Sequence, residues 1–268
     1  MKRRLCLFFI VIVTAHAASS QTAEEYFYIA NRHSIEGRFH EALTVFTEAV
    51  KRHHDNAMVH FGLGHLYYHL QNGALALQHL SRAIELDSTF ALAYAIRAEV
   101  FESIHEYDRA LDDLNMAVYL EPENDDHYFH RAYFTVLGDF TRALADFNIA
   151  ILLNPSYENF HNRGVFYTSI WLYEYALDDL NKAIQLNSED IISWLRRGNV
   201  FFSLGRHHEA VLDFTEVIKI EPTNSDAFYN RSTAYKYLAT LASDPEQARL
   251  YWQRAQEDEA IADWLDGQ

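Results

Sequence analysis

A decapeptide that occurs three times at a nearly fixed spacing is the feature that most constrains this 268-residue chain. The three copies are "RALDDLNMAV" from Arg109, "RALADFNIAI" from Arg142 and "YALDDLNKAI" from Tyr175. Self-similarity with a period of about 20–50 residues indicates a repeat architecture, in which one supersecondary unit packs against the next. The fold must therefore be a stack of similar units.

Each copy contains an alanine that recurs along most of the chain and marks one helix of every unit. The alanines are Ala42, Ala76, Ala110, Ala143, Ala176, Ala210 and Ala248, at intervals of 34, 34, 33, 33, 34 and 38 residues. A large apolar residue follows four positions later, and a small residue (valine in one unit) follows seven positions later. Spacings of 0, 4 and 7 place these side chains on one face of an α-helix.

A second small residue precedes each of these helices and marks another helix. It is found at Ala30, Ala98, Ala132, Gly64, Gly164, Gly198 and Ser232. Mostly aromatic residues stand four positions before it and three after it, so the spacing is again helical. Each unit is thus predicted to be a pair of antiparallel helices, with Gly37, Gly138 and Gly205 in three of the turns.

This pattern resembles the tetratricopeptide repeat family. The resemblance is carried by the two-helix unit, the 34-residue period, "NRG" (162–164) followed by Tyr167, and "ALDDLNKAIQLN" (176–187). It covers roughly residues 23–257 and implies an all-α fold, an α-solenoid in which antiparallel helix pairs form a right-handed superhelix. The last unit departs from the pattern through an insertion around "LASDPEQ" (241–247), where Asp244 can cap a helix beginning at Pro245.

The predicted domain organisation follows from these periods. We expect a signal peptide (1–17), a short linker (18–22), helix pairs at about 23–56, 57–90, 91–124, 125–156, 157–190, 191–224 and 225–257, and a C-terminal capping segment (258–268). In that segment, Trp264 either shields the last hydrophobic face or docks on a partner or a second copy.

The first residues predict export. Lys2, Arg3 and Arg4 precede an apolar run (5–13), and "AHA" (15–17) offers small residues for cleavage after Ala17. An uncleaved anchor or a buried helix is the alternative. We expect a bacterial periplasmic or secreted protein that has lost Cys6, its only cysteine, and so forms no disulfide.

The charge balance excludes some partners. Cleavage would leave 19 basic against 38 acidic residues, and such a surface repels phosphate backbones and anionic membranes. We therefore expect a protein or peptide partner, no nucleic acid and no transmembrane segment after cleavage.

The resemblance implies that peptides or partner helices bind in a concave groove lined by the first helices. By helical geometry the candidate groove residues are Phe27, Asn31, Phe61, His65, Tyr68, His69, Phe129, Tyr133, His161, Asn162, Asn199, Phe202, Tyr229 and Lys236. About half of them are expected to pack between units instead. Lysines that hold a terminal carboxylate in some family members are missing beside Asn31, Asn162 and Asn199, which disfavours a chaperone-tail adaptor.

Five units also carry an arginine just before the small site. The ladder is Arg97, Arg131, Arg163, Arg197 and Arg231. It could grip an acidic ligand, or each arginine could pair with a carboxylate of the adjacent unit, for instance an aspartate of a second helix. Regular recurrence at one site favours the pairing.

Two other functions, a metal or small-ligand binder that uses groove histidines and an enzyme, have weaker support. His65 and His69 are spaced i, i+4 on one helix and are a weak candidate pair for a transition metal, although two ligands need a third and His60 is turned away. Catalysis has little support, because the mature chain lacks cysteine and shows neither a strand-turn-helix nucleophile context nor a Gly-rich phosphate loop. We predict no catalytic residues, no cofactor and a non-enzymatic interaction scaffold.

Overall fold

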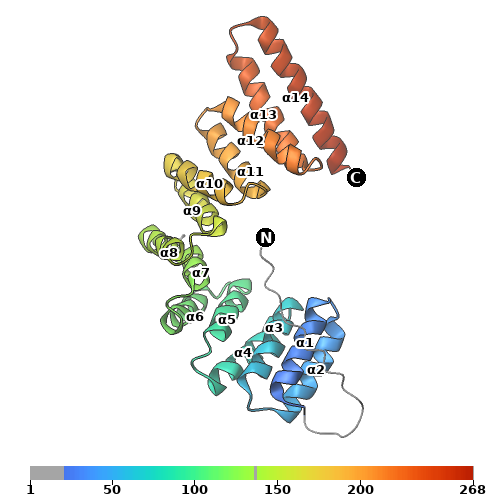
Figure 1. Cartoon of the computed structure of the whole chain (residues 1–268), viewed down its shortest axis with the longest axis vertical. Helices are drawn as coiled ribbons and strands as arrows, with labels where there is room; N and C mark the ends of the chain where they lie inside the picture. Colours follow the sequence, from blue (N-terminus) through green and yellow to red (C-terminus); the bar gives the residue numbers. More distant parts are fainter. Residues whose placement is uncertain (1–20, 136–137, 268) are drawn as a thin grey trace. The chain divides into compact units, whose positions relative to one another are not determined.

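The computed structural model describes residues 21–135 and 138–267, and this part of the chain is built from helices without a β-strand (Figure 1). The predicted signal peptide, Cys6 and residues 18–20 of the linker lie outside the described residues. The predicted all-α fold of tandem helix pairs is confirmed.

The described helices follow one another as seven consecutive pairs. They are α1 (Ala23–Ile35), α2 (Phe39–Arg52), α3 (Ala57–His69), α4 (Gly73–Leu86), α5 (Ala91–Ser103), α6 (Tyr107–Leu120), α7 (Asp125–Thr135), α8 (Phe140–Leu153), α9 (Tyr157–Ser169), α10 (Tyr173–Leu186), α11 (Ile191–Ser203), α12 (His207–Ile220), α13 (Ser225–Leu241) and α14 (Pro245–Asp266). They fall into two compact units, one ending at Ile104 with α1–α5 and one beginning at His105 with α6–α14.

In the first unit the core forms where a large side chain of a second helix meets small residues of first helices. Phe46 of α2 is fully buried against Ala30 of α1 and against Leu63 and Leu66 of α3. A Cβ added at Gly62 would lie 2.4 Å from the Phe46 ring. Gly62 is therefore a second close-approach site in α3, beside the predicted Gly64.

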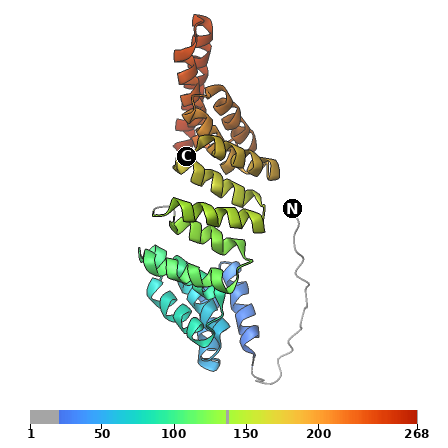
Figure 2. The ribbon, with the colours of Figure 1, turned by 90° about the vertical axis from the view of Figure 1, so that its left-hand side faces the viewer.

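The second unit repeats this arrangement in successive layers, and Figure 2 shows α7 to α10 stacked one above another. Leu114, Leu180 and Phe214 of the second helices are almost completely buried. A Cβ at Gly164 would lie 2.9 Å from Leu180, and one at Gly198 would lie 2.6 Å from Phe214. The predicted stripe of small and large residues is thus the core of the stack.

In five of the pairs that the structure describes, the turn contains one residue in the left-handed conformation. Gly37 and Gly205 have φ values of 73° and 72°, in the left-handed region, and Gly138 lies between α7 and α8. Gln71, His105 and Trp171 adopt the same conformation at φ values of 57°, 63° and 59°. Since L-residues pay about 1–2 kcal/mol there, packing of the flanking helices must hold these turns.

The last pair is longer than the others. Asp244 accepts a hydrogen bond from the Glu246 backbone N–H at 3.1 Å and Pro245 opens α14, as predicted. The predicted capping segment is not a separate element, because α14 continues through it to Asp266. Within that segment Asp258 and Ala262 are buried, whereas Trp264 is 62% exposed. None of the described helices is both long enough and apolar enough to span a bilayer.

We predict that Gly64→Ala destabilises the protein by about 1–3 kcal/mol. The added Cβ would lie 2.8 Å from Leu80 Cγ and 3.0 Å from the Leu80 backbone nitrogen, so the α3–α4 backbones would have to separate. This cost outweighs the gain of about 1 kcal/mol in helix propensity. Urea unfolding followed by circular dichroism measures it.

Gly73→Ala is the matched control in the neighbouring helix, because its Cβ would meet Ile104 and Val100 at an ordinary 3.7 Å. It should leave stability unchanged or raise it slightly. Equal losses in the two variants would contradict the close-approach argument.

Candidate partner-binding surface

The first helices carry the predicted groove residues, and several of these pack between helices. Phe61 is only 6% exposed, with its ring centre 4.9 Å from that of Phe90. Phe27 lies edge-on to Phe46 at 6.0 Å. Phe61 and Phe27 thus contribute mainly to the core of the first unit.

The second unit uses predicted groove residues in the same way. Phe129 packs beside Phe147 at 6.2 Å. The ring of His161 is hydrogen-bonded through Nδ1 to Ser193 Oγ at 2.8 Å, which joins α9 to α11. Phe202 was also predicted to line the groove, and its ring centre lies 5.1 Å from that of Tyr237 on α13. The contacts of His161 and Phe202 link the first helices of successive pairs, whereas that of Phe129 lies within one pair.

Other predicted residues do offer surface to a partner. Tyr133 of α7 is 59% exposed and Tyr229 of α13 is 58% exposed. His69 and Asn199 are exposed as well, and Asn31, His65, Tyr68, Asn162 and Lys236 are half-buried. Lys236 is already neutralised, because its Nζ lies 2.8 Å from both carboxylate oxygens of Glu259.

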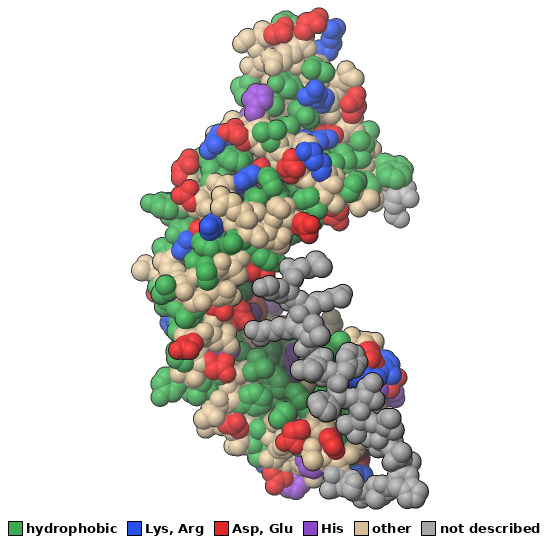
Figure 3. All heavy atoms as spheres, viewed as in Figure 1, with side chains coloured by type: hydrophobic (Ala, Val, Ile, Leu, Met, Phe, Trp, Pro, Cys, Tyr) green, Lys and Arg blue, Asp and Glu red, His purple; other side chains and the backbone are tan. Residues whose placement is uncertain are grey.

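Sequence reasoning missed two exposed aromatic residues on first helices. Tyr28 of α1 is 70% exposed and Tyr237 of α13 is 50% exposed. Tyr237 stands five positions after Ser232, as His69 stands five after Gly64, so the repeat register could have identified it. On the face seen in Figure 3, acidic and basic side chains of the second unit are interspersed with hydrophobic ones.

The arginine ladder is paired inside the fold. In the second unit each arginine forms a two-pronged salt bridge with a buried aspartate, and Arg163 is typical, with Nε and Nη2 both 2.7 Å from the Asp179 carboxylate oxygens. The equivalent pairs are Arg131–Asp146, Arg197–Asp213 and Arg231–Asp258. The guanidinium also lies over an aromatic ring, as for Arg197 at 4.7 Å from the Trp194 ring centre.

The pairing differs from the prediction in one respect. The aspartate belongs to the arginine's own helix pair, and the adjacent pair supplies a neutral oxygen instead. Arg163 Nη1 donates to Asn148 Oδ1 at 2.5 Å, and Arg197 Nη1 donates to Asn181 Oδ1 at 2.6 Å. In the first unit Arg97 donates to Ser81 Oγ at 3.0 Å. Each of these arginines therefore ties its own pair to the preceding one.

Burial and charge pairing act in opposite directions on the pKa values of these groups. Burial raises the pKa of the Asp213 carboxyl, while Arg197 acts to lower it. The hydrogen bond from Arg131 to Asp146 raises the pKa of that guanidinium. A buried aspartate without its arginine would be an uncompensated charge, so the ladder is structural in the second unit.

We predict that Arg197→Met lowers the free energy of unfolding by about 3–5 kcal/mol, because it strands the Asp213 charge in the interior. The double variant Arg197→Met/Asp213→Leu should recover most of this loss. Lys219→Ala is the control, since the Lys219–Glu216 pair is exposed and contributes less than about 1 kcal/mol. Urea unfolding of the four proteins provides the comparison, and failure of the double variant to recover would argue against a stranded charge.

Two pairs of histidines lie in the second helix pair of the first unit. His60 of α3 and His79 of α4 are joined through their Nδ1 atoms at 3.1 Å, and His60 Nε2 is 3.0 Å from the His54 carbonyl oxygen. His65 and His69 approach each other through their Nε2 atoms at 3.0 Å. In the part of the chain that the structure describes, no three His, Cys, Asp or Glu side chains gather in a way that could hold a metal ion.

Burial lowers the pKa of His79 to about 4, from 6.5, and also lowers the pKa of His60. The ring centre of Tyr67 lies 5.7 Å from that of His79. The hydrogen bond to the His54 backbone acts to raise the pKa of His60, whereas the charges of Arg82 and His54 lower it further. The neutral pair therefore contributes stability above about pH 6.5, and this contribution is lost as the pH falls towards 4.

We predict that acidification from pH 7 to pH 4.5 removes about 1–3 kcal/mol more stability from the wild type than from His79→Gln, which lacks the His79 imidazole that the fold keeps neutral. His40→Gln, on the exposed surface of α2, should follow the wild type. Urea midpoints measured across this range test the difference, and parallel pH profiles for His79→Gln and the wild type would contradict the prediction.

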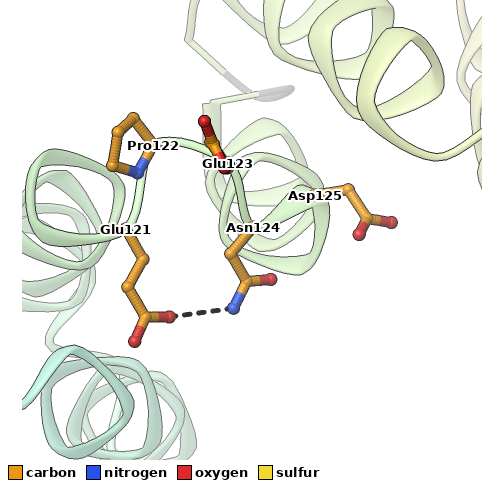
Figure 4. A pocket seen from close by; sticks show the side chains of 5 residues that line it. All are labelled: Glu121, Pro122, Glu123, Asn124 and Asp125. Carbon is orange, nitrogen blue, oxygen red and sulfur yellow. Dashed lines mark hydrogen bonds between the residues drawn. The ribbon is translucent and has the colours of Figure 1, made fainter.

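A shallow cavity in the second unit lies against the linker between α6 and α7 (Figure 4). It is lined by Glu121, Pro122, Glu123, Asn124 and Asp125. Its polar groups are already used: the Glu121 carboxylate accepts from Asn124 Nδ2 at 3.0 Å and meets His127 Nε2 at 3.0 Å. These hydrogen bonds lower the pKa of Glu121 and stabilise the linker, so this carboxyl is not poised as a general acid.

Comparison with known proteins agrees with this architecture. Tetratricopeptide repeat family models match residues 30–89 and 191–224. The chain thus contains tetratricopeptide repeats. Tetratricopeptide repeat proteins generally act as scaffolds that bind proteins or peptides, and the fold is typically non-enzymatic.

Solved structures share the tetratricopeptide repeat fold at low identity. The C-terminal part of a repeat-containing protein from Cytophaga hutchinsonii is 18% identical with a TM-score of 0.71, over 87% of this chain and 95% of that one. A tetratricopeptide repeat protein from Parabacteroides merdae is 19% identical, with a TM-score of 0.66 over 91% and 97%. PilW, described as a widely conserved type IV pilus biogenesis factor, is 18% identical, with a TM-score of 0.64 over 76% and 90%.

Proposed function

We propose that this chain is a non-enzymatic scaffold that binds a peptide or a partner protein on the exposed side of its first helices. The observation that carries the proposal is the exposure of Tyr133, Asn199 and Tyr229, which belong to first helices and are not needed for the core. Packing and the arginine ladder account for the regularly repeated residues. Recognition of a partner is therefore expected at the positions that differ between repeats.

The chemistry of these positions suits recognition of a polypeptide. Tyrosine supplies a large and rigid contact area with a hydroxyl at its tip, at a low cost in conformational entropy. Asparagine supplies both a donor and an acceptor for an extended backbone. The chain carries 38 acidic against 22 basic residues, and this excess of negative charge favours a neutral or basic partner.

We place this scaffold outside the cytoplasm, in a bacterial periplasm or in a secreted setting. The support is the sequence of the first 17 residues, with three basic residues, an apolar run and small residues before Ala17. Mass spectrometry of the protein from its native host tests the proposal, because a mature N-terminus at Ala18 is expected. An intact N-terminus in a cytoplasmic fraction would overturn it.

We predict that a photoreactive amino acid at Tyr133 or Asn199 captures the partner, whereas one at Tyr119 does not. Tyr119 is a matched control in the same unit, since it is 77% exposed but stands on the second helix α6. Crosslinking in the native host followed by mass spectrometry identifies the captured protein. Tyr133→Ala should then weaken binding of that purified partner by about tenfold, or about 1.4 kcal/mol. Capture only from Tyr119 would place recognition on the opposite helices.

A further inference from the structure

His65 and His69 form an unusual pair on the exposed side of α3. They are one turn apart, with Nε2 atoms separated by 3.0 Å, ring centres by 4.4 Å and ring planes inclined at 54°. His69 is exposed and His65 is half-buried. The ring nitrogens are thus adjacent and accessible from solvent.

The distance between the ring centres of this pair is shorter than that expected for a straight hydrogen bond between two imidazoles. A straight contact of about 3 Å between imidazole nitrogens puts the ring centres about 5.3 Å apart, since each nitrogen lies about 1.1 Å from its ring centre. The buried pair His60–His79 has this geometry, with 3.1 Å between nitrogens and 5.3 Å between ring centres. The value of 4.4 Å for His65–His69 means that this contact is not straight, so the two rings lie partly side by side with their Nε2 atoms adjacent.

The separation of the two nitrogens allows one metal ion to bridge them. With metal–nitrogen bonds of about 2.0–2.1 Å, nitrogens 3.0 Å apart subtend an angle of about 94° at the ion, and the ring centres would be about 4.6 Å apart. An angle near 90° corresponds to neighbouring positions of a square-planar or octahedral ion. A tetrahedral ion would need about 3.3 Å between the nitrogens.

The surroundings hold the pair in its liganding form. The ring of Phe61 lies beside His65 at 5.8 Å and is inclined by 20°, and Phe61 is itself fixed against Phe90. Tyr68 flanks His69 at 5.8 Å.

We propose that His65 and His69 chelate a divalent transition metal ion that prefers square-planar or octahedral coordination, namely Cu²⁺ or Ni²⁺. Water fills the remaining positions, because no third clustered His, Cys, Asp or Glu ligand is found among the described residues. The buried pair His60–His79 does not serve this purpose. His60 Nε2 donates to the His54 carbonyl and its Nδ1 accepts from His79, so these nitrogens offer no converging lone pairs.

Titration of the untagged protein with Ni²⁺ at neutral pH, followed by calorimetry, tests the site. We expect one Ni²⁺ per chain at micromolar concentration, binding weakened about tenfold or more in His65→Ala and in His69→Ala, and no change in His40→Ala, whose histidine is exposed on α2. Circular dichroism checks that all variants are folded, and His65→Gln and His69→Gln replace any alanine variant that is not.

A second measurement reads out the ligands directly. The electron paramagnetic resonance spectrum of the Cu²⁺ form should show two nitrogen ligands in the wild type and one in each single variant. The proposal is overturned if the wild type binds neither ion below millimolar concentration, if the double variant His65→Ala/His69→Ala binds with unchanged affinity and stoichiometry, or if Zn²⁺ binds more tightly than Cu²⁺.

Discussion

The close approach of the two helices within each pair is the constraint on which the rest of the structure depends. A second helix inserts one large side chain, such as Leu180 or Phe214, opposite a residue of the first helix that has almost no side chain. Because backbone and side chain fill the same narrow space, volume must be conserved at both positions. The small and large residues therefore recur together along the sequence, and the period of the repeat is the period of this contact.

The arginine ladder connects each helix pair to the preceding one and so adds a second packing constraint. A buried guanidinium–carboxylate pair contributes little net stability when compared with apolar packing, yet it tolerates no missing partner. Asp179 and Asp213 are therefore compatible with the interior only while Arg163 and Arg197 are in place. One consequence concerns binding, because these cations are committed to the fold and are not available to an acidic ligand.

Much of this architecture could be predicted from the sequence, because periodic packing leaves a periodic pattern. The helix pairs, the buried stripe and the cap at Asp244 were all predictable. Features that leave no repeated pattern in the sequence could not be predicted from it. Gln71 and Trp171 hold left-handed turns without being glycine, because packing of the flanking helices can force that backbone. The burial of Phe61 depends on Phe90 in the linker before α5, and helical geometry within α3 cannot show it.

The hydrogen bonds that run from each arginine back to the preceding pair also determine how the stack comes apart. In a solenoid, stability is approximately a sum of terms within repeats and terms between nearest neighbours. The contacts Arg163–Asn148 and Arg197–Asn181 add to the stabilisation between neighbouring pairs. Opening one helix pair therefore breaks the hydrogen bonds that its neighbour's arginine makes to it. The second unit should therefore unfold cooperatively, as a block of several repeats, and not one helix pair at a time.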